Sequence, residues 1–132
     1  MSAWKKWKYA LTNHCETRDN HEDEELRSHY YKATNNAVMK AVKELFASSP
    51  DYELLSVSEE RGEFSAQTRR GKKVFIIATV ISVRPLETAV DFSVTTETTL
   101  LPFDFGRSRN VIIDLYRKLD QRLPYIGSGL NA

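Results

Sequence analysis

The amino-acid sequence predicts a two-layer α+β fold, in which two helices pack on one face of an antiparallel sheet of four to five strands. Two stretches with helical apolar periodicity enclose a middle third that is rich in β-type patterns. Short turns separate the strands of that third, and consecutive strands joined by short turns pair in an antiparallel way. The apolar stripes of the two helices have one natural place to be buried, which is the apolar face of the sheet.

Length, charge and cysteine count limit the class of protein. A chain of 132 residues is one domain's worth of protein. Its 19 Lys and Arg residues and 18 Asp and Glu residues leave a net charge of +1, so bulk charge does not indicate a nucleic-acid or membrane partner. One cysteine excludes an internal disulfide and a zinc site of several thiolates, and we expect no cofactor.

The sequence predicts neither a membrane span nor a secretory signal. The longest apolar run, residues 74–81, already contains Thr79 and is far shorter than the roughly 20 residues of a membrane span. The basic start of the chain has no apolar core behind it. Together with one unpaired cysteine, these features predict a cytoplasmic protein.

The chain divides into residues 1–26 and a single α+β domain over residues 27–132. Trp4, Trp7 and Leu11 share one face at helical spacing, which predicts an N-terminal amphipathic segment. Residues 16–25 then hold six carboxylates and one arginine, a net charge of −5, without apolar periodicity. That composition predicts a solvated acidic connector between the segment and the domain.

Within residues 27–132 the expected order is strand, helix, four strands, helix. The first helix has Thr34 or Asn35 as its cap and ends before Pro50. The second begins near Asp104 or Ser108, and residues 127–129 beyond it predict a flexible tail. The expected strands cover residues 27–32, 52–57, 63–68, 73–83 and 88–98.

The strand over residues 73–83 is apolar on both faces, which conflicts with a sheet that is covered on one side. Two helices cover one face, so the other set of side chains is left in water unless another layer shields it. At about 25 cal/mol per Å² of apolar surface, three or four such side chains forfeit several kcal/mol, comparable to the net stability of a domain. One set is Val74, Ile76, Ala78 and Val80, and the other is Phe75, Ile77, Ile81 and Val83.

Three covers would resolve this conflict. The stripe of Trp4, Trp7 and Leu11 would fold across the far face, or a second subunit would pair with that face as a homodimer. A strongly curved sheet would instead enclose a cavity for an apolar small ligand. The simplest alternative is a central strand flanked by its neighbours and the N-terminal segment.

All three histidines lie in one short stretch, but their spacing does not favour a metal site. His14, His21 and His29 are seven and eight residues apart, about 11 Å on a helix, which is too far for one ion. We therefore expect them to be solvated side chains of the connector. The sequence contains no pattern that predicts an acid–base constellation, although carboxylate chemistry stays open.

Two basic clusters are candidate anion-binding sites. A hairpin tip carries Arg69, Arg70, Lys72 and Lys73, and the start of the last helix carries Arg107 and Arg109. Backbone N–H groups at the start of a helix favour anions. The alternative is that both clusters are solvated faces of a nearly neutral protein, which argues against a nucleic-acid partner.

The C-terminal half contains two runs that are similar to one known family. Residues 88–97 form an alternating strand, Thr-Ala-Val-Asp-Phe-Ser-Val-Thr-Thr-Glu, and residues 103–112 read Phe-Asp-Phe-Gly-Arg-Ser-Arg-Asn-Val-Ile. From about residue 27 to residue 123 the chain resembles a bacterial domain-of-unknown-function family, number fourteen ninety-nine, although Ser108 replaces the expected Asn. The resemblance implies the same order of elements and no reaction, because that family has no established activity.

From these observations we expect a non-catalytic binding or self-association module. Its partner would be a second copy, another protein or an apolar small ligand, recognised through the doubly apolar strand. The alternative is anion or nucleic-acid binding through the basic clusters at residues 69–73 and 107–109.

Overall fold

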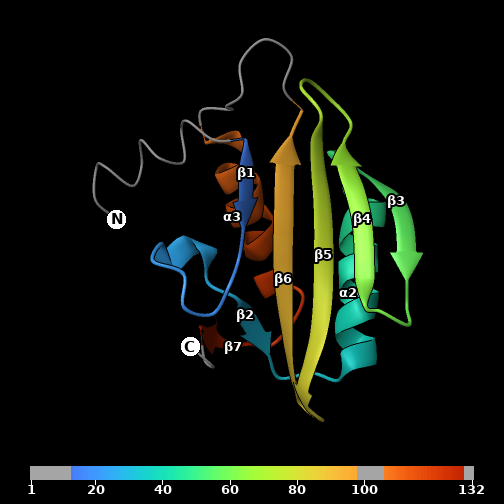
Figure 1. Cartoon of the computed structure of the whole chain (residues 1–132). Helices are drawn as coiled ribbons and strands as arrows, with labels where there is room; N and C mark the ends of the chain where they lie inside the picture. The colour runs from blue at the N-terminus through green and yellow to red at the C-terminus, as the bar shows by residue number, and fades with distance from the viewer. Residues whose placement is uncertain (1–12, 98–105, 130–132) are drawn as a thin grey trace.

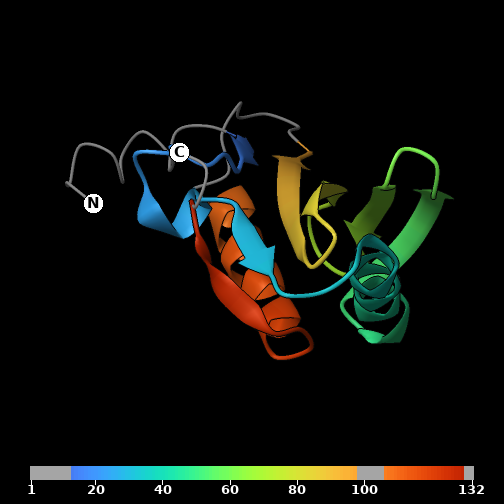
Figure 2. The same cartoon turned by 90° about the horizontal axis from the view of Figure 1, so that it is seen from below.

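The computed structural model describes residues 13–97 and 106–129 (Figure 1). One antiparallel sheet has the strand order β3-β4-β5-β6-β2-β7, and β1 pairs with β6 beside β2. Figure 2 shows that both helices lie on the same side of this sheet. The α+β architecture predicted from the sequence is confirmed, with seven strands in place of four to five. The elements are β1 (His14–Glu16), η1 (Glu24–Leu26), β2 (His29–Tyr31), α2 (Asn35–Ser48), β3 (Tyr52–Ser58), β4 (Glu63–Thr68), β5 (Val74–Arg84), β6 (Glu87–Thr96), α3 (Arg107–Asp120) and β7 (Tyr125–Ser128).

The two additional strands, β1 and β7, lie where the sequence predicts no strand: β1 ends at the first residue of the expected connector, and β7 overlaps the expected tail. In β1, residues 14–16 pair with residues 93–95 of β6. In β7, residues 125–128 pair with β2, so the prediction of a flexible tail is wrong. Both strands are short, and a distant strand supplies their hydrogen-bonding partners, which no local pattern reveals.

The acidic connector over residues 16–25 is partly built into the fold. Four of its six carboxylates are exposed, as predicted, but Thr17, His21 and Asp23 are buried. A buried carboxylate requires a partner, and Arg109 supplies it for Asp23.

Helix α2 follows the apolar stripe predicted for it. The hydroxyl of Thr34 accepts a hydrogen bond from the N–H of Ala37 at 3.2 Å and caps the helix. The chain leaves the helix at Ser49, immediately before Pro50. The buried side chains of the helix are Val38, Ala41, Val42, Leu45 and Phe46.

Helix α3 begins at Arg107, behind Gly106 in the left-handed conformation (φ 84°). Glycine adopts this conformation without strain. Asp104, one of two expected starting points, lies outside the described residues, and Ser108 lies inside the helix. Neither described helix is long and apolar enough to cross a membrane. The buried residues of α3 are Ser108, Ile112, Leu115, Tyr116 and Leu119.

Candidate functional site

Strand β5 turns its two apolar sets to opposite sides of the sheet, as the sequence predicts. The set that faces the helices is at most 5% exposed and consists of Val74, Ile76, Ala78 and Val80. The opposite set is 36–47% exposed and consists of Phe75, Ile77, Ile81 and Val83. We call these four exposed side chains the outer stripe and their side of the sheet the outer face. Figure 1 looks onto the outer face, with both helices behind the sheet.

The outer stripe is bordered mainly by polar side chains of β4 and β6. Strand pairing places Ser65 of β4 and Ser93 of β6 on either side of Ile77. Thr79 lies at the middle of the stripe, with two apolar residues at equal spacing on each side of it. Along β5 the stripe is therefore nearly symmetrical about Thr79.

Two carboxylates flank the middle of the outer stripe. Glu63 of β4 and Asp91 of β6 pair with Thr79 from its two sides. The Oδ1 atom of Asp91 accepts hydrogen bonds from the hydroxyls of Thr17, at 2.7 Å, and Ser28. These bonds join the ends of β1 and β2 to the same edge of β6.

The two ends of the outer face carry opposite charge. The turn between β4 and β5 holds four basic residues and no acidic one. The turn between β3 and β4 and the residue that follows it hold Glu59, Glu60 and Glu63 with Arg61, a net charge of −2. Figure 1 shows these two turns at opposite ends of the sheet.

The two basic clusters predicted from the sequence meet at one end of the sheet. Arg107 donates a hydrogen bond from Nη2 to the carbonyl of Lys72 at 3.0 Å. Arg69 turns toward β3, where its Nε donates to the carbonyl of Tyr52 at 2.9 Å. Within the described part of the chain, no ion pair holds the side chains of Arg70, Lys72 and Lys73.

Arg109 is separated from this cluster by a buried ion pair. Its Nε lies 2.7 Å from Oδ2 of Asp23, which is 2% exposed. Burial alone raises the pKa of Asp23, but the hydrogen bonds from Arg109 and from the backbone N–H of Glu25 outweigh that effect and lower it. The ion pair holds α3 against the segment that leads to η1, so Arg109 serves the fold.

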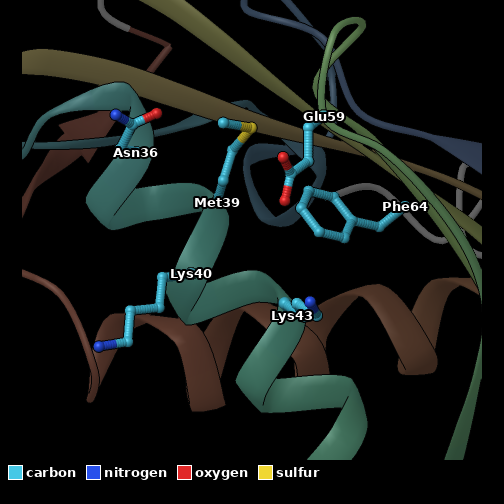
Figure 3. A pocket seen from close by; sticks show the side chains of 6 residues that line it. All are labelled: Asn36, Met39, Lys40, Lys43, Glu59 and Phe64. Carbon is cyan, nitrogen blue, oxygen red and sulfur yellow. The ribbon is translucent and has the colours of Figure 1, made fainter.

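A groove of about 400 Å³ lies between α2 and the turn from β3 to β4. Figure 3 shows the side chains that line it. Phe64 is 1% exposed, so it offers a ligand almost no apolar surface. Lysine side chains of α2 and the carboxylate of Glu59 line the same groove. An apolar ligand would gain little by entering it, because polar groups would lose water without gaining partners. The lining residues are Asn36, Met39, Lys40, Lys43, Glu59 and Phe64.

Beside β7, the fold brings Asp120 of α3 together with His29 and Tyr31 of β2, which are about 90 residues earlier in the chain. Nδ1 of His29 lies 3.0 Å from Oδ1 of Asp120, and the same oxygen accepts the hydroxyl of Tyr31 at 2.6 Å. Burial and then Asp120 raise the pKa of Tyr31. His29 is therefore not the solvated side chain expected from the sequence. Among the residues that the structure describes, no three His, Cys, Asp or Glu side chains are placed to hold a metal ion.

Comparison with known proteins supports the fold alone. No family model matches the chain, and no curated protein is similar to it. Among solved structures, an uncharacterised protein from Bacillus thuringiensis is similar with a TM-score of 0.56 at 10% identity. The match covers 83% of this chain and 95% of that chain. The resemblance to the domain-of-unknown-function family therefore stays a prediction.

A signal for the His29 and Asp120 pair is present in the sequence. His29 and Tyr31 have the same parity in a strand, so they share one face of the sheet. Tyr116 and Asp120 are four residues apart, so they share one face of a helix. The sequence does not show that this strand lies against this helix. The position of β2 beside α3 is set by its pairing with β6, which is distant in the sequence.

Proposed function

We propose that the protein is a self-association module in which two copies pack their outer faces against each other. The observation that carries this proposal is the outer stripe, four large apolar side chains that are 36–47% exposed on a central strand. Exposed apolar surface of this kind is typical of interaction sites. A single cysteine suits a reducing compartment, and we place this module in the cytoplasm.

The symmetry of the outer stripe favours a second copy over a different protein as the partner. A two-fold axis in the plane of the interface, perpendicular to β5 at Thr79, turns the strand of one copy antiparallel to that of the other. Ile77 then lies opposite Ile81 of the second copy, and Phe75 lies opposite Val83. Aligned packing of two sheets face to face, within about 30°, is a common arrangement.

The charges at the two ends favour the same orientation. The two-fold axis places the basic turn at residues 69–73 of one copy over the acidic turn at residues 59–63 of the second. Each dimer contains this pair of turns twice, since the contact is reciprocal. Complementary charges of this kind fix orientation and speed association more than they add affinity.

The size of the outer face predicts a weak dimer. Eight residue steps separate Phe75 from Val83, about 26 Å at 3.3 Å per residue, and four strands span about 19 Å. The resulting area of roughly 500 Å² per copy is below the roughly 800 Å² per partner of a standard interface. Glu63 would also approach its own counterpart near the axis. We therefore expect dissociation in the micromolar range or above.

Sedimentation velocity over a range of concentrations tests the proposal. The wild-type chain should shift from monomer to dimer, and Ile77→Lys should remain a monomer because it places a charge at the centre of the interface. Ile126→Lys is the matched control, since Ile126 is 45% exposed on β7, away from the outer stripe. A wild-type chain that stays monomeric at millimolar concentration would contradict the proposal.

Charge reversal tests the orientation separately. Lys72→Glu with Lys73→Glu should weaken the dimer, and so should Glu59→Lys with Glu60→Lys. An equimolar mixture of the two double variants should restore association, because each then meets a complementary turn. If the mixture associates no better than either variant alone, the antiparallel arrangement is wrong. Salt-dependent binding of inorganic phosphate or DNA at the same lysines would instead favour anion binding.

A further inference from the structure

His29 is held in one orientation by two aromatic rings. Its imidazole is stacked on the ring of Tyr116, with centroids 3.7 Å apart and planes 6° apart. The ring of Tyr125 lies at 4.8 Å and is tilted by 37°. The hydroxyl of Tyr116 donates to the carbonyl of Val90 at 2.6 Å, so the ring beneath the imidazole is itself anchored. A side chain packed in this way has little rotational freedom.

Asp120 fixes which nitrogen of His29 carries the proton. Nδ1 lies 3.0 Å from the carboxylate and donates to it, while Tyr31 donates to the same carboxylate oxygen. Nε2 is then left with its lone pair. It has no hydrogen-bond partner among the described residues, and the side chain of His29 is 14% exposed. This is the arrangement in which an Asp–His pair presents a base.

The imidazole lines a pocket that contains further polar groups. The pocket has a volume of about 290 Å³ and lies between η1, β2 and α3. Arg117 and Glu25 project from two different elements, and the structure records no ion pair between them. The side chain of His29 is 14% exposed and that of Asp120 is 27% exposed, so a small molecule has access to the pair. The lining residues are Glu25, His29, Ile113, Tyr116, Arg117 and Asp120.

We propose that this pocket is a hydrolytic site in which His29 acts as a general base on water and the substrate is a small carboxylic ester. Nε2 takes a proton from water as the water oxygen forms a bond to the acyl carbon. Asp120 stabilises the imidazolium that results, and Arg117, an exposed residue that lines the pocket, would stabilise the oxyanion. As the bond from the acyl carbon to the alcohol oxygen breaks, the imidazolium returns its proton to that oxygen. The products are a carboxylic acid and an alcohol.

The composition of the site favours esters over amides. One imidazole serves first as base and then as acid, so the reaction is easiest for leaving groups that need little protonation. The pocket volume suits a small acyl group, since larger ligand sites reach roughly 1,000 Å³. Among the described residues, no serine, threonine or cysteine lines the pocket as an alternative nucleophile, which favours water as the attacking group.

The site is independent of the self-association interface. His29 pairs with Val90 and faces the helix side of the sheet, whereas the outer stripe lies on the opposite face. Variants of one surface therefore leave the other intact, and the two proposals fail separately.

Hydrolysis of p-nitrophenyl acetate by the full chain tests the proposal. The wild-type chain should release p-nitrophenolate faster than buffer, and His29→Gln should lose about 100-fold of that rate. Asp120→Asn should lower kcat and leave KM nearly unchanged, because Asp120 positions the base and does not touch the ester. His14→Gln is the matched control, since His14 is an exposed histidine at a distant edge and its loss should change nothing.

Further measurements distinguish the general base from other roles. Circular dichroism and thermal melting establish that each variant folds. Arg117→Gln, a substitution at an exposed position, should raise KM or lower kcat if Arg117 stabilises the oxyanion. Hydrolysis should be slower in heavy water, because a proton moves in the transition state. Mass spectrometry that finds acetylated His29 would overturn the general-base step in favour of direct attack by Nε2. A wild-type rate no faster than that of His29→Gln would overturn the catalytic site altogether.

Discussion

The two faces of β5 have nearly the same residue types and opposite surroundings. Toward the helices, Ile76 pairs with Ala66 and Val94, and α2 lies over the same side of the sheet. Toward the outer face, Ile77 pairs with two serines and is 47% exposed. Hydropathy along one strand therefore does not determine burial. What lies on the neighbouring strands and on the layer above decides which face becomes core.

The contrast also separates two kinds of charged group. On the helix side, the carboxylate of Asp23 is buried and needs the guanidinium of Arg109. On the outer face, Glu63 is exposed to water and no ion pair is recorded for it in the described part of the chain. Water solvates the second charge, and only the protein solvates the first. Matched substitutions on the two faces should therefore differ in their effect on stability.

The largest expected difference is between Ile76→Ala and Ile77→Ala. Ile76→Ala leaves a cavity in the core and should lower the free energy of unfolding by about 3 kcal/mol. Ile77→Ala should cost less than about 1 kcal/mol in the monomer, because half of its side chain is already in water. Urea denaturation at a concentration below that of dimer formation measures both. Equal losses would mean that the outer face is covered in solution.

Much of this contrast follows from the sequence, because it depends on local periodicity. The alternation of β5 predicts both of its faces, and helical apolar periodicity predicts the helix observed as α2. Residues 63–68 are predicted as a strand and observed as β4. These features need only a repeat of two or 3.6 residues and a recognisable turn.

The features that the sequence does not predict depend on partners far along the chain. Strand β1 exists because β6 offers it an edge, and no pattern within its three residues requires it. His29 and Asp120 are 91 residues apart, and Asp23 and Arg109 are 86 apart. Each pair is a contact between elements whose arrangement is set by the sheet order. The same limit applies to Arg107 of α3, which donates a hydrogen bond to the carbonyl of Lys72, 35 residues earlier in the chain.

The second-largest difference in the free energy of unfolding is expected between Asp23→Asn and Glu63→Gln. Asp23→Asn removes the partner of a largely buried guanidinium and should cost about 2 kcal/mol. Glu63→Gln should stay within about 0.5 kcal/mol, because water solvates that carboxylate in the folded and the unfolded chain. It should also strengthen the dimer, since it removes a like-charge contact near the two-fold axis.

Acid pH gives an independent measure of the same carboxylate. The pKa of Asp23 in the folded protein is lowered from its ordinary value of 3.8. The stability it contributes is therefore fully present above that ordinary value and is lost as the pH falls through the lower, folded pKa. Asp23→Asn should remove this part of the loss of stability below about pH 4, whereas Glu63→Gln should leave it. An acid transition that is unchanged in Asp23→Asn would contradict the assignment.

The smallest expected difference is between two isosteric changes of hydroxyl groups, Thr88→Val and Thr79→Val. Thr88 is fully buried on the helix side, and its hydroxyl donates to the carbonyl of Ala33 at 2.8 Å. Its loss leaves that carbonyl without this donor and should lower the free energy of unfolding by about 1 kcal/mol. Thr79 lies at the middle of the outer stripe, so Thr79→Val should leave monomer stability nearly unchanged and make the stripe continuous.

That change also sharpens the comparison of the two faces, because Thr79→Val acts on association and Thr88→Val on folding. Filling the centre of the outer stripe with a methyl group should tighten the dimer several-fold, measured by sedimentation at matched concentrations. Thr88→Val should leave the association constant unchanged once the chain is folded. If Thr79→Val destabilises the monomer as much as Thr88→Val does, the two faces are equally buried, and the physical reason for self-association disappears.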